Sequence, residues 1–111
     1  MAKKKKEDSL FERIRRVVKQ IPPGKVAYYS QVGAYCGGCS GRVVGFAMAS
    51  LNAEEAKLVP WQRVINIKGR ISPHGFGGLL QRELLEQEGI EFRPDGSIEF
   101  EKYLWDGPNT E

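Results

Sequence analysis

The side chains with the clearest chemical potential in this 111-residue chain are two cysteines, Cys36 and Cys39, in the stretch YCGGCSG. A thiolate can act as a nucleophile or bind a metal ion, but a structural zinc site needs four ligands. The chain has no second CxxC pair and only one histidine, His74. We therefore expect two thiols in a glycine-rich turn, with no metal and no cofactor. A reversible disulfide and a chance metal contact are the alternatives.

A second unusual stretch is KLVPWQRVI, residues 57–65, where an apolar run is interrupted by Pro60, Trp61, Gln62 and Arg63. Proline has no N–H for a strand ladder, and arginine is out of place in a buried run. The indole N–H is only a donor, and an amide is no base near neutral pH, so nucleophilic chemistry is excluded at both Trp61 and Gln62. Trp61 either fills space in the core or offers an aromatic face for stacking.

The composition predicts a single domain whose charge is compatible with binding to nucleic acid. The hydrophobic fraction is 41%, the net charge is +3 and the pI is about 8.9. This mildly basic balance permits nucleic-acid binding without requiring it. Apolar runs are too short to span a membrane, and the start MAKKKKEDS lacks the apolar segment of a signal peptide. We expect a cytoplasmic or nucleoid protein with a basic flexible tail at 1–8, one domain at 9–105 and a flexible tail at 106–111.

The elements that position these residues begin with a helix. Ser9 and Glu12 form the pattern of a capping box, and Pro22-Pro23-Gly24 ends the helix. One apolar face at helical spacing is expected to face the core. Its members are Leu10, Ile14, Val17, Val18 and Ile21.

The next segment has the outline of a helix-turn-helix. After an extended piece at 26–29, Ser30 can cap a short helix that runs to Tyr35, and Ser40 can cap a second helix over 41–52. The second helix is rich in small residues, including Gly41 and Gly45. Such residues permit either tight helix packing or entry into a narrow groove, with Arg42 at the N-terminal end.

The C-terminal half predicts short elements joined by turns. We expect a polar loop at 52–57, a turn at 66–70, a glycine-rich loop at 72–78 and a hairpin at 90–100. A helix over 79–89 should turn three leucines inward and end at Gly89. These leucines are Leu79, Leu80 and Leu84. The predicted fold class is α+β, mostly helical, of the winged-helix type with a helix-turn-helix.

Four sequence motifs of this chain resemble, in the same order, those of a known protein family. The chain contains IPPGKVAYYSQVG, GRVVGFAMASLN, VPWQRVINIKGRIS and LLEQEG. It resembles the C-terminal DNA-binding domain of O6-alkylguanine-DNA alkyltransferases, which read IPxGxVxxYxxLA, ARxVGxAM, PCHRV and LLxxEG. The resemblance covers about residues 11–90. It implies the same winged-helix fold.

The departure from the family pattern lies at Trp61 and Gln62. They stand where the transferases have the nucleophilic Cys and the adjacent His. A Trp in place of the Cys marks the alkyltransferase-like proteins, which lack transferase activity. The resemblance therefore implies a protein that is not an enzyme.

The resemblance also assigns DNA contacts. Arg42 matches the arginine that fills the gap left by a flipped base, and Tyr29 matches the tyrosine that crowds the 3′ phosphate. The helix 41–51 would lie in the minor groove, with Ser40, Gly41 and Gly45 against the DNA.

The same motifs assign a pocket and its support. The flipped base would meet Trp61, and His74 would act as a lid. The remaining pocket residues are Tyr29, Met48, Pro60 and Val64. The residues expected to tie the active-site turn to the core are Asn52, Arg63 and Glu88.

The resulting prediction is a monomeric, non-catalytic sensor of O6-alkylguanine in duplex DNA. It would flip the lesion and hand it to nucleotide excision repair proteins. One alternative is a residual alkyltransferase that uses Cys36 or Cys39. The other is a generic winged-helix regulator with preferred sequences in undamaged DNA.

Overall fold

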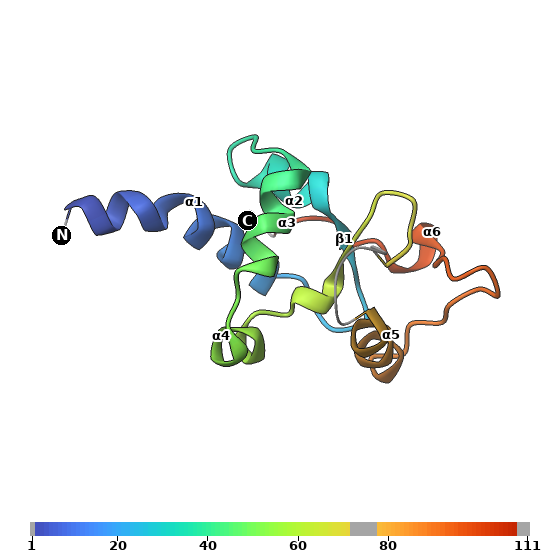
Figure 1. Cartoon of the computed structure of the whole chain (residues 1–111). Helices are drawn as coiled ribbons and strands as arrows, with labels where there is room; N and C mark the ends of the chain where they lie inside the picture. Colours follow the sequence, from blue (N-terminus) through green and yellow to red (C-terminus); the bar gives the residue numbers. More distant parts are fainter. Residues whose placement is uncertain (1, 72–77, 109–111) are drawn as a thin grey trace.

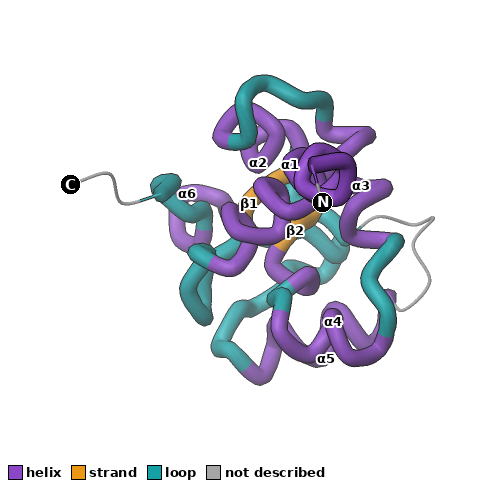
Figure 2. Tube along the Cα trace, turned by 90° about the vertical axis from the view of Figure 1, so that its left-hand side faces the viewer, coloured by secondary structure: helices purple, strands orange, loops and turns teal. Residues whose placement is uncertain are grey.

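The computed structural model describes residues 2–71 and 78–108. Helices surround a central two-stranded parallel sheet (Figure 2). This arrangement confirms the α+β, mostly helical fold class. In chain order the elements are α1 (Ala2–Lys19), β1 (Ala27–Tyr28), α2 (Tyr29–Tyr35), α3 (Gly41–Ala49), α4 (Ala53–Leu58), the 3₁₀ turn η1 (Trp61–Arg63), β2 (Val64–Ile65), α5 (Gly78–Gln87) and α6 (Phe100–Tyr103).

Helix α1 follows the predicted apolar face but starts earlier. Ile14, Val18 and Ile21 are almost fully buried, as the spacing predicts. The helix begins at Ala2, not at the capping box of Ser9. Residues 2–8, the predicted basic tail, form the first turns of this helix, which project from the body of the molecule (Figure 1).

The sheet joins the two halves of the chain. Ala27 pairs with Val64, and Tyr28 with Ile65. Successive strand residues point to opposite faces. Ala27 and Val64 belong to one core cluster with α1, α2 and α3. Ile65 packs in a second cluster with residues of α5 and the C-terminal segment.

Helices α2 and α3 form the predicted helix-turn-helix. Ser40 caps α3, because its hydroxyl accepts a hydrogen bond from the Val43 N–H at 3.2 Å. A side chain at Gly41 would approach the Ser30 nitrogen to 3.0 Å, so the two helices meet at a glycine. The hydroxyl of Ser30 is not needed for the cap, since α2 already begins at Tyr29.

Residues 53–58 form helix α4 where a polar loop was predicted. Asn52 and Glu55 make reciprocal hydrogen bonds, with Asn52 N–H to Glu55 at 3.0 Å and Glu55 N–H to Asn52 at 2.8 Å. This is a capping box. The sequence signal was therefore present in NAEE.

Helix α5 is rotated relative to the prediction. Leu79 and Leu80, predicted to point inward, are 88% and 50% exposed. Gln81 and Leu85 are the buried residues of this helix. This face is held by Leu85, which packs in the second core cluster, and by Gln81, whose amide donates to backbone carbonyls.

The predicted hairpin at 90–100 is wrong. Only the turn forms, closed by the Arg93 N–H to the Ser97 carbonyl at 2.7 Å. Beyond the turn, Ser97 bridges Arg70 instead of the strand before it, and the Ile98 N–H donates to the Gly69 carbonyl. The segment is thus held by the turn at 66–70. Among the described residues, no helix is both long and apolar enough to cross a bilayer.

Candidate nucleic-acid interface

The stretch PWQRV folds as a 3₁₀ turn followed by a buried strand. Pro60 precedes the turn, and the Arg63 N–H donates to the Pro60 carbonyl at 3.0 Å. The Trp61 N–H donates to the Val59 carbonyl at 2.7 Å. The proline and the polar pair therefore serve a tight turn, which explains why they interrupt the apolar run.

Glu88 is the centre of the network that holds this turn. Arg63 Nε lies 3.1 Å from both carboxylate oxygens of Glu88, and Arg63 Nη2 lies 3.0 Å from Oε2. Glu88 also accepts from the Gly24 N–H at 3.0 Å and from Gln62 Nε2 at 2.9 Å. Arg63 Nη1 donates to the Ile21 carbonyl at 2.8 Å. The turn is thereby tied to the segments that directly follow α1 and α5.

The network keeps Glu88 ionised. Burial acts to raise the pKa of its carboxyl, but hydrogen bonds from Arg63, the Gly24 N–H and Gln62 outweigh it and hold that pKa below the ordinary value. Gln62, which the sequence indicates only as a residue that replaces a base, is one of these donors. Its side-chain amide helps to hold the turn through Glu88.

Gln81 is a supporting residue that the sequence analysis missed. Its side-chain Nε2 donates to the carbonyls of Gln62 at 3.1 Å and Val64 at 3.0 Å. The residue is only 7% exposed. A glutamine four positions before the buried Leu85 lies on the same helix face, and that spacing is the signal that could have found it.

Trp61 is half-buried and belongs to neither core cluster of the described residues. The other tryptophan, Trp105, is 7% exposed and packs in the first cluster. This contrast favours a side chain that is available to a ligand over one that only fills the core.

The other predicted pocket residues divide into two groups. Tyr29 and Met48 are half-buried and pack against the first core cluster, and Pro60 is half-buried beside Trp61. Val64 is fully buried in that cluster, so its side chain is not open to a ligand. His74 lies outside the described residues. Burial raises the pKa of Tyr29, so its hydroxyl stays protonated and can donate a hydrogen bond.

The predicted DNA-contacting residues gather at α3. Arg42 and the capping Ser40 are exposed, and Gly45 is half-buried. Gly41 is explained within the fold, since a side chain there would meet Ser30 and would also lie 3.2 Å from Tyr29 Cβ. Gly45 has no such explanation: a Cβ built on it has nothing within 4 Å. Its lack of a side chain suits an external surface that must come close.

Asn52, predicted to tie the turn to the core, lies at the start of α4. Its side chain caps α4 through Glu55, so it organises the helix that leads into the turn.

The two cysteines lie in the turn between α2 and α3. The carbonyl of Gly33 accepts hydrogen bonds from the N–H groups of Cys36, Gly38 and Cys39 at 3.0–3.1 Å. Both thiols are free, and Cys36 is 3% exposed. Burial, followed by the neighbouring Cys39, raises the pKa of Cys36 to about 11. That thiol is therefore protonated near neutral pH and is a poor nucleophile.

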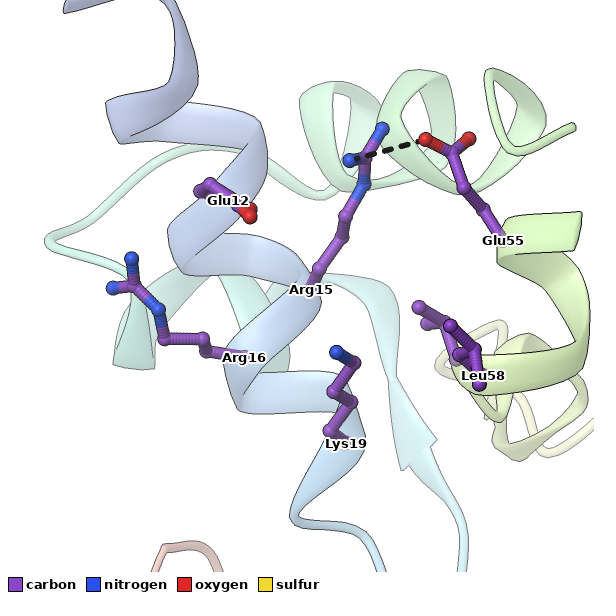
Figure 3. A pocket seen from close by; sticks show the side chains of 7 residues that line it. Glu12, Arg15, Arg16, Lys19, Glu55 and Leu58 are labelled. Carbon is purple, nitrogen blue, oxygen red and sulfur yellow. Dashed lines mark ion pairs between the residues drawn. The ribbon is translucent and has the colours of Figure 1, made fainter. Parts of the chain in front are cut away.

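A surface hollow of about 170 Å³ lies apart from this region, between α1 and α4 (Figure 3). Arg15 and Glu55 point toward one another across it, 3.6 Å apart. The remaining lining residues are Glu12, Arg16, Lys19, Leu58 and Val59. None of them belongs to the predicted site.

Comparison with known proteins gives matches over most of the chain. The family described as "6-O-methylguanine DNA methyltransferase, DNA binding domain" matches residues 9–90. A DNA base-flipping protein of Vibrio parahaemolyticus is 41% identical over 100 residues, which cover 88% of this chain and 97% of that protein. Alkyltransferase-like protein 1 of Schizosaccharomyces pombe is 36% identical over 105 residues, covering 88% and 95% respectively.

The fold has a close counterpart among solved structures. Atl1 of S. pombe, in complex with damaged DNA containing O6-carboxymethylguanine, superposes with a TM-score of 0.79 and 35% sequence identity. The match covers 89% of this chain and 96% of the S. pombe chain.

Proposed function

Since this chain belongs to the 6-O-methylguanine DNA methyltransferase family, as one of its alkyltransferase-like proteins, we propose that it is a non-catalytic sensor of O6-alkylguanine in duplex DNA. The observation that carries the proposal is the turn at 61–63. Hydrogen bonds of Arg63, Glu88 and Gln81 hold this turn in place, yet its first residue is Trp61, whose indole is not a nucleophile.

In the proposed mechanism, α3 enters the minor groove of the duplex. Guanine O6 lies on the Watson–Crick edge, so the base must leave the stack before it can be inspected. Flipping costs a few kcal/mol, and less for a lesion that already pairs poorly. Arg42, exposed near the start of α3, would fill the gap, and Tyr29 beside Gly41 would crowd the phosphate.

The flipped base would then stack on Trp61, between Pro60 and the half-buried Tyr29 and Met48. Aromatic stacking contributes roughly 1–3 kcal/mol per base, which is enough to offset much of the flipping cost. His74 would cover the alkyl group. An indole accepts no alkyl group, so the lesion is bound and not repaired.

A residual transferase has less support. The thiol of Cys36 is buried, with its pKa raised to about 11. A transferase would need a thiolate beside a base, whereas the thiols lie in the turn that precedes α3, beside one another. A protein that binds a lesion without repairing it must act by recruiting other proteins. We expect this protein to work as a monomer in the cytoplasm or nucleoid. It would hand the bound lesion to nucleotide excision repair proteins.

The proposal is tested by equilibrium binding to two duplexes of one sequence at a fixed salt concentration, one of them with a single O6-methylguanine. We expect tighter binding to the damaged duplex. Equal affinities would refute the sensor. A sequence selected reproducibly from undamaged DNA would instead indicate a regulator. Methyl label transferred from DNA to the protein would establish the transferase.

A further inference from the structure

Helix α3 turns one continuous face to solvent. Val44 and Ala47 are buried, and Val43 and Met48 are half-buried against the first core cluster. The opposite face follows helical spacing. It consists of Arg42, Gly45, Phe46, Ala49 and Ser50.

Phe46 is the exception on this face. Its neighbours on the face are small, except for Arg42 one turn before it, yet the phenyl ring is 57% exposed. A large exposed aromatic side chain among small residues is unfavourable in the free protein, because its apolar surface stays in water. Its presence there suits a surface that is covered in a complex.

Arg42 and Phe46 form a pair. The guanidinium carbon of Arg42 lies 5.9 Å from the centroid of the Phe46 ring. This distance lies within the range of a cation–π contact. The contact favours arginine conformations that lie near the ring before any DNA is present.

We propose that Phe46 is an apolar wedge that contacts deoxyribose and base edges in the minor groove and positions Arg42 for insertion. The proposal rests on the proposed function, in which α3 binds that groove. Proteins that bend DNA from the minor groove often insert phenylalanine or leucine between base steps. Four residues of helix rise span about 6 Å, against about 3.4 Å per base-pair step, so Arg42 and Phe46 reach different steps.

The test compares Phe46→Ala with the unaltered protein on both duplexes over a range of salt concentrations. We expect roughly tenfold weaker binding to damaged and undamaged DNA alike, since an apolar contact of this size is lost. The slope of log affinity against log salt should stay unchanged, because no phosphate contact is removed. Arg42→Ala should lower that slope, because it removes a positive charge that would displace counterions from the DNA. The matched control is Leu58→Ala, which removes a 70% exposed side chain from α4 and should bind as the unaltered protein does.

Two further variants isolate the positioning role. Phe46→Leu keeps an apolar side chain without the aromatic face, so it should restore part of the affinity but not the coupling to Arg42. A double-mutant cycle of Arg42→Ala and Phe46→Ala should show non-additive losses. Thermal unfolding should show all variants folded, since alanine and leucine favour helix.

Unchanged affinity of Phe46→Ala for both duplexes would overturn the proposal. So would an equal loss in Leu58→Ala, which would indicate a general effect of removing surface apolar groups. If the unaltered protein lacks lesion preference, the sensor fails, but the effect of Phe46→Ala on undamaged DNA still decides this proposal.

Discussion

In the proposed pocket, Trp61 would give the selectivity for the lesion. We predict that Trp61→Ala lowers the preference for O6-methylguanine more than it lowers binding to undamaged duplex. The lost stacking of roughly 1–3 kcal/mol corresponds to about a 5- to 150-fold change in the ratio of dissociation constants. Competition binding with the two duplexes measures this ratio.

Trp105→Phe is the matched control for that experiment. Trp105 is 7% exposed and packs in the first core cluster, so its substitution should reduce stability and leave the preference intact. A preference that survives Trp61→Ala would show that the pocket lies elsewhere.

A second prediction at the residue scale concerns Glu88 and the pH dependence of the free energy of unfolding. Its folded-state pKa lies below the ordinary value of about 4.3, so its contribution is complete above that pH and is lost as the pH falls through the folded pKa. Glu88→Gln leaves the guanidinium of Arg63, whose side chain is 14% exposed, without its partner. We expect a loss of about 3 kcal/mol near pH 7.

Urea unfolding at several pH values checks this expectation. The difference in unfolding free energy between the unaltered protein and Glu88→Gln should shrink steadily below about pH 4, as Glu88 becomes protonated. A pH-independent difference would contradict the assigned pKa direction.

The residues of the site were predictable to different degrees. Arg63 and Glu88 came from motif positions, and the structure brings them into contact. Gln81 was not predictable from local pattern, because its acceptors are backbone carbonyls 17 and 19 positions earlier in the chain. Val64 was placed in the pocket by its motif, whereas strand pairing with Ala27 buries it.

At the scale of the element, α3 contains two glycines with opposite roles. We predict that Gly45→Ala stabilises the fold by up to about 1 kcal/mol, because alanine favours helix and its Cβ meets open space. The same substitution should weaken DNA binding, since the methyl group stands between α3 and the groove.

Gly41→Ala is the matched comparison. Its Cβ would press on the Ser30 nitrogen at 3.0 Å, so this variant should lose stability. Thermal unfolding and duplex binding measured on both variants test the pair. Gly45→Ala with unchanged affinity would show that this face of α3 does not approach DNA closely.

The predicted helices and strands were correct where a local sequence signal agreed with the burial pattern. They were wrong where a contact between distant parts of the chain determined the structure. The cap at Ser40 and the apolar face of α1 are local, and both are seen. The hairpin prediction failed because Ser97 pairs with Arg70, 27 positions earlier in the chain. Helix α5 was rotated because Gln81 and Leu85, and not Leu79 and Leu80, form its inward face.

At the scale of the whole molecule, the short parallel sheet places the helix-turn-helix and the turn at Trp61 on one framework. The order of the sequence motifs predicted that the helix-turn-helix and the turn at Trp61 occur in one fold, because the family that shares these motifs has that fold. The pairing of Ala27 with Val64 could not be read from strands of only two residues each. Such short strands lack the alternation that identifies longer ones.

The hand-over to repair is a prediction at this same scale. Loss of the protein should increase sensitivity to an O6-alkylating agent in cells with intact nucleotide excision repair, but add nothing in cells that lack that pathway. Survival curves of the single and double deletions measure this. Additive sensitivity in the double deletion would place the protein in a different pathway.

The anchoring of the turn at residues 61–63 has a consequence for how such proteins diversify. Its side-chain hydrogen bonds come from Gln62, Arg63 and Gln81, and none of them uses the side chain of Trp61. A codon change at position 61 therefore alters the ligand chemistry while leaving the scaffold standing. Cysteine and tryptophan codons can differ by one base. We therefore expect that a single base change at this codon can remove a reactive thiol while the hydrogen bonds that hold the turn remain.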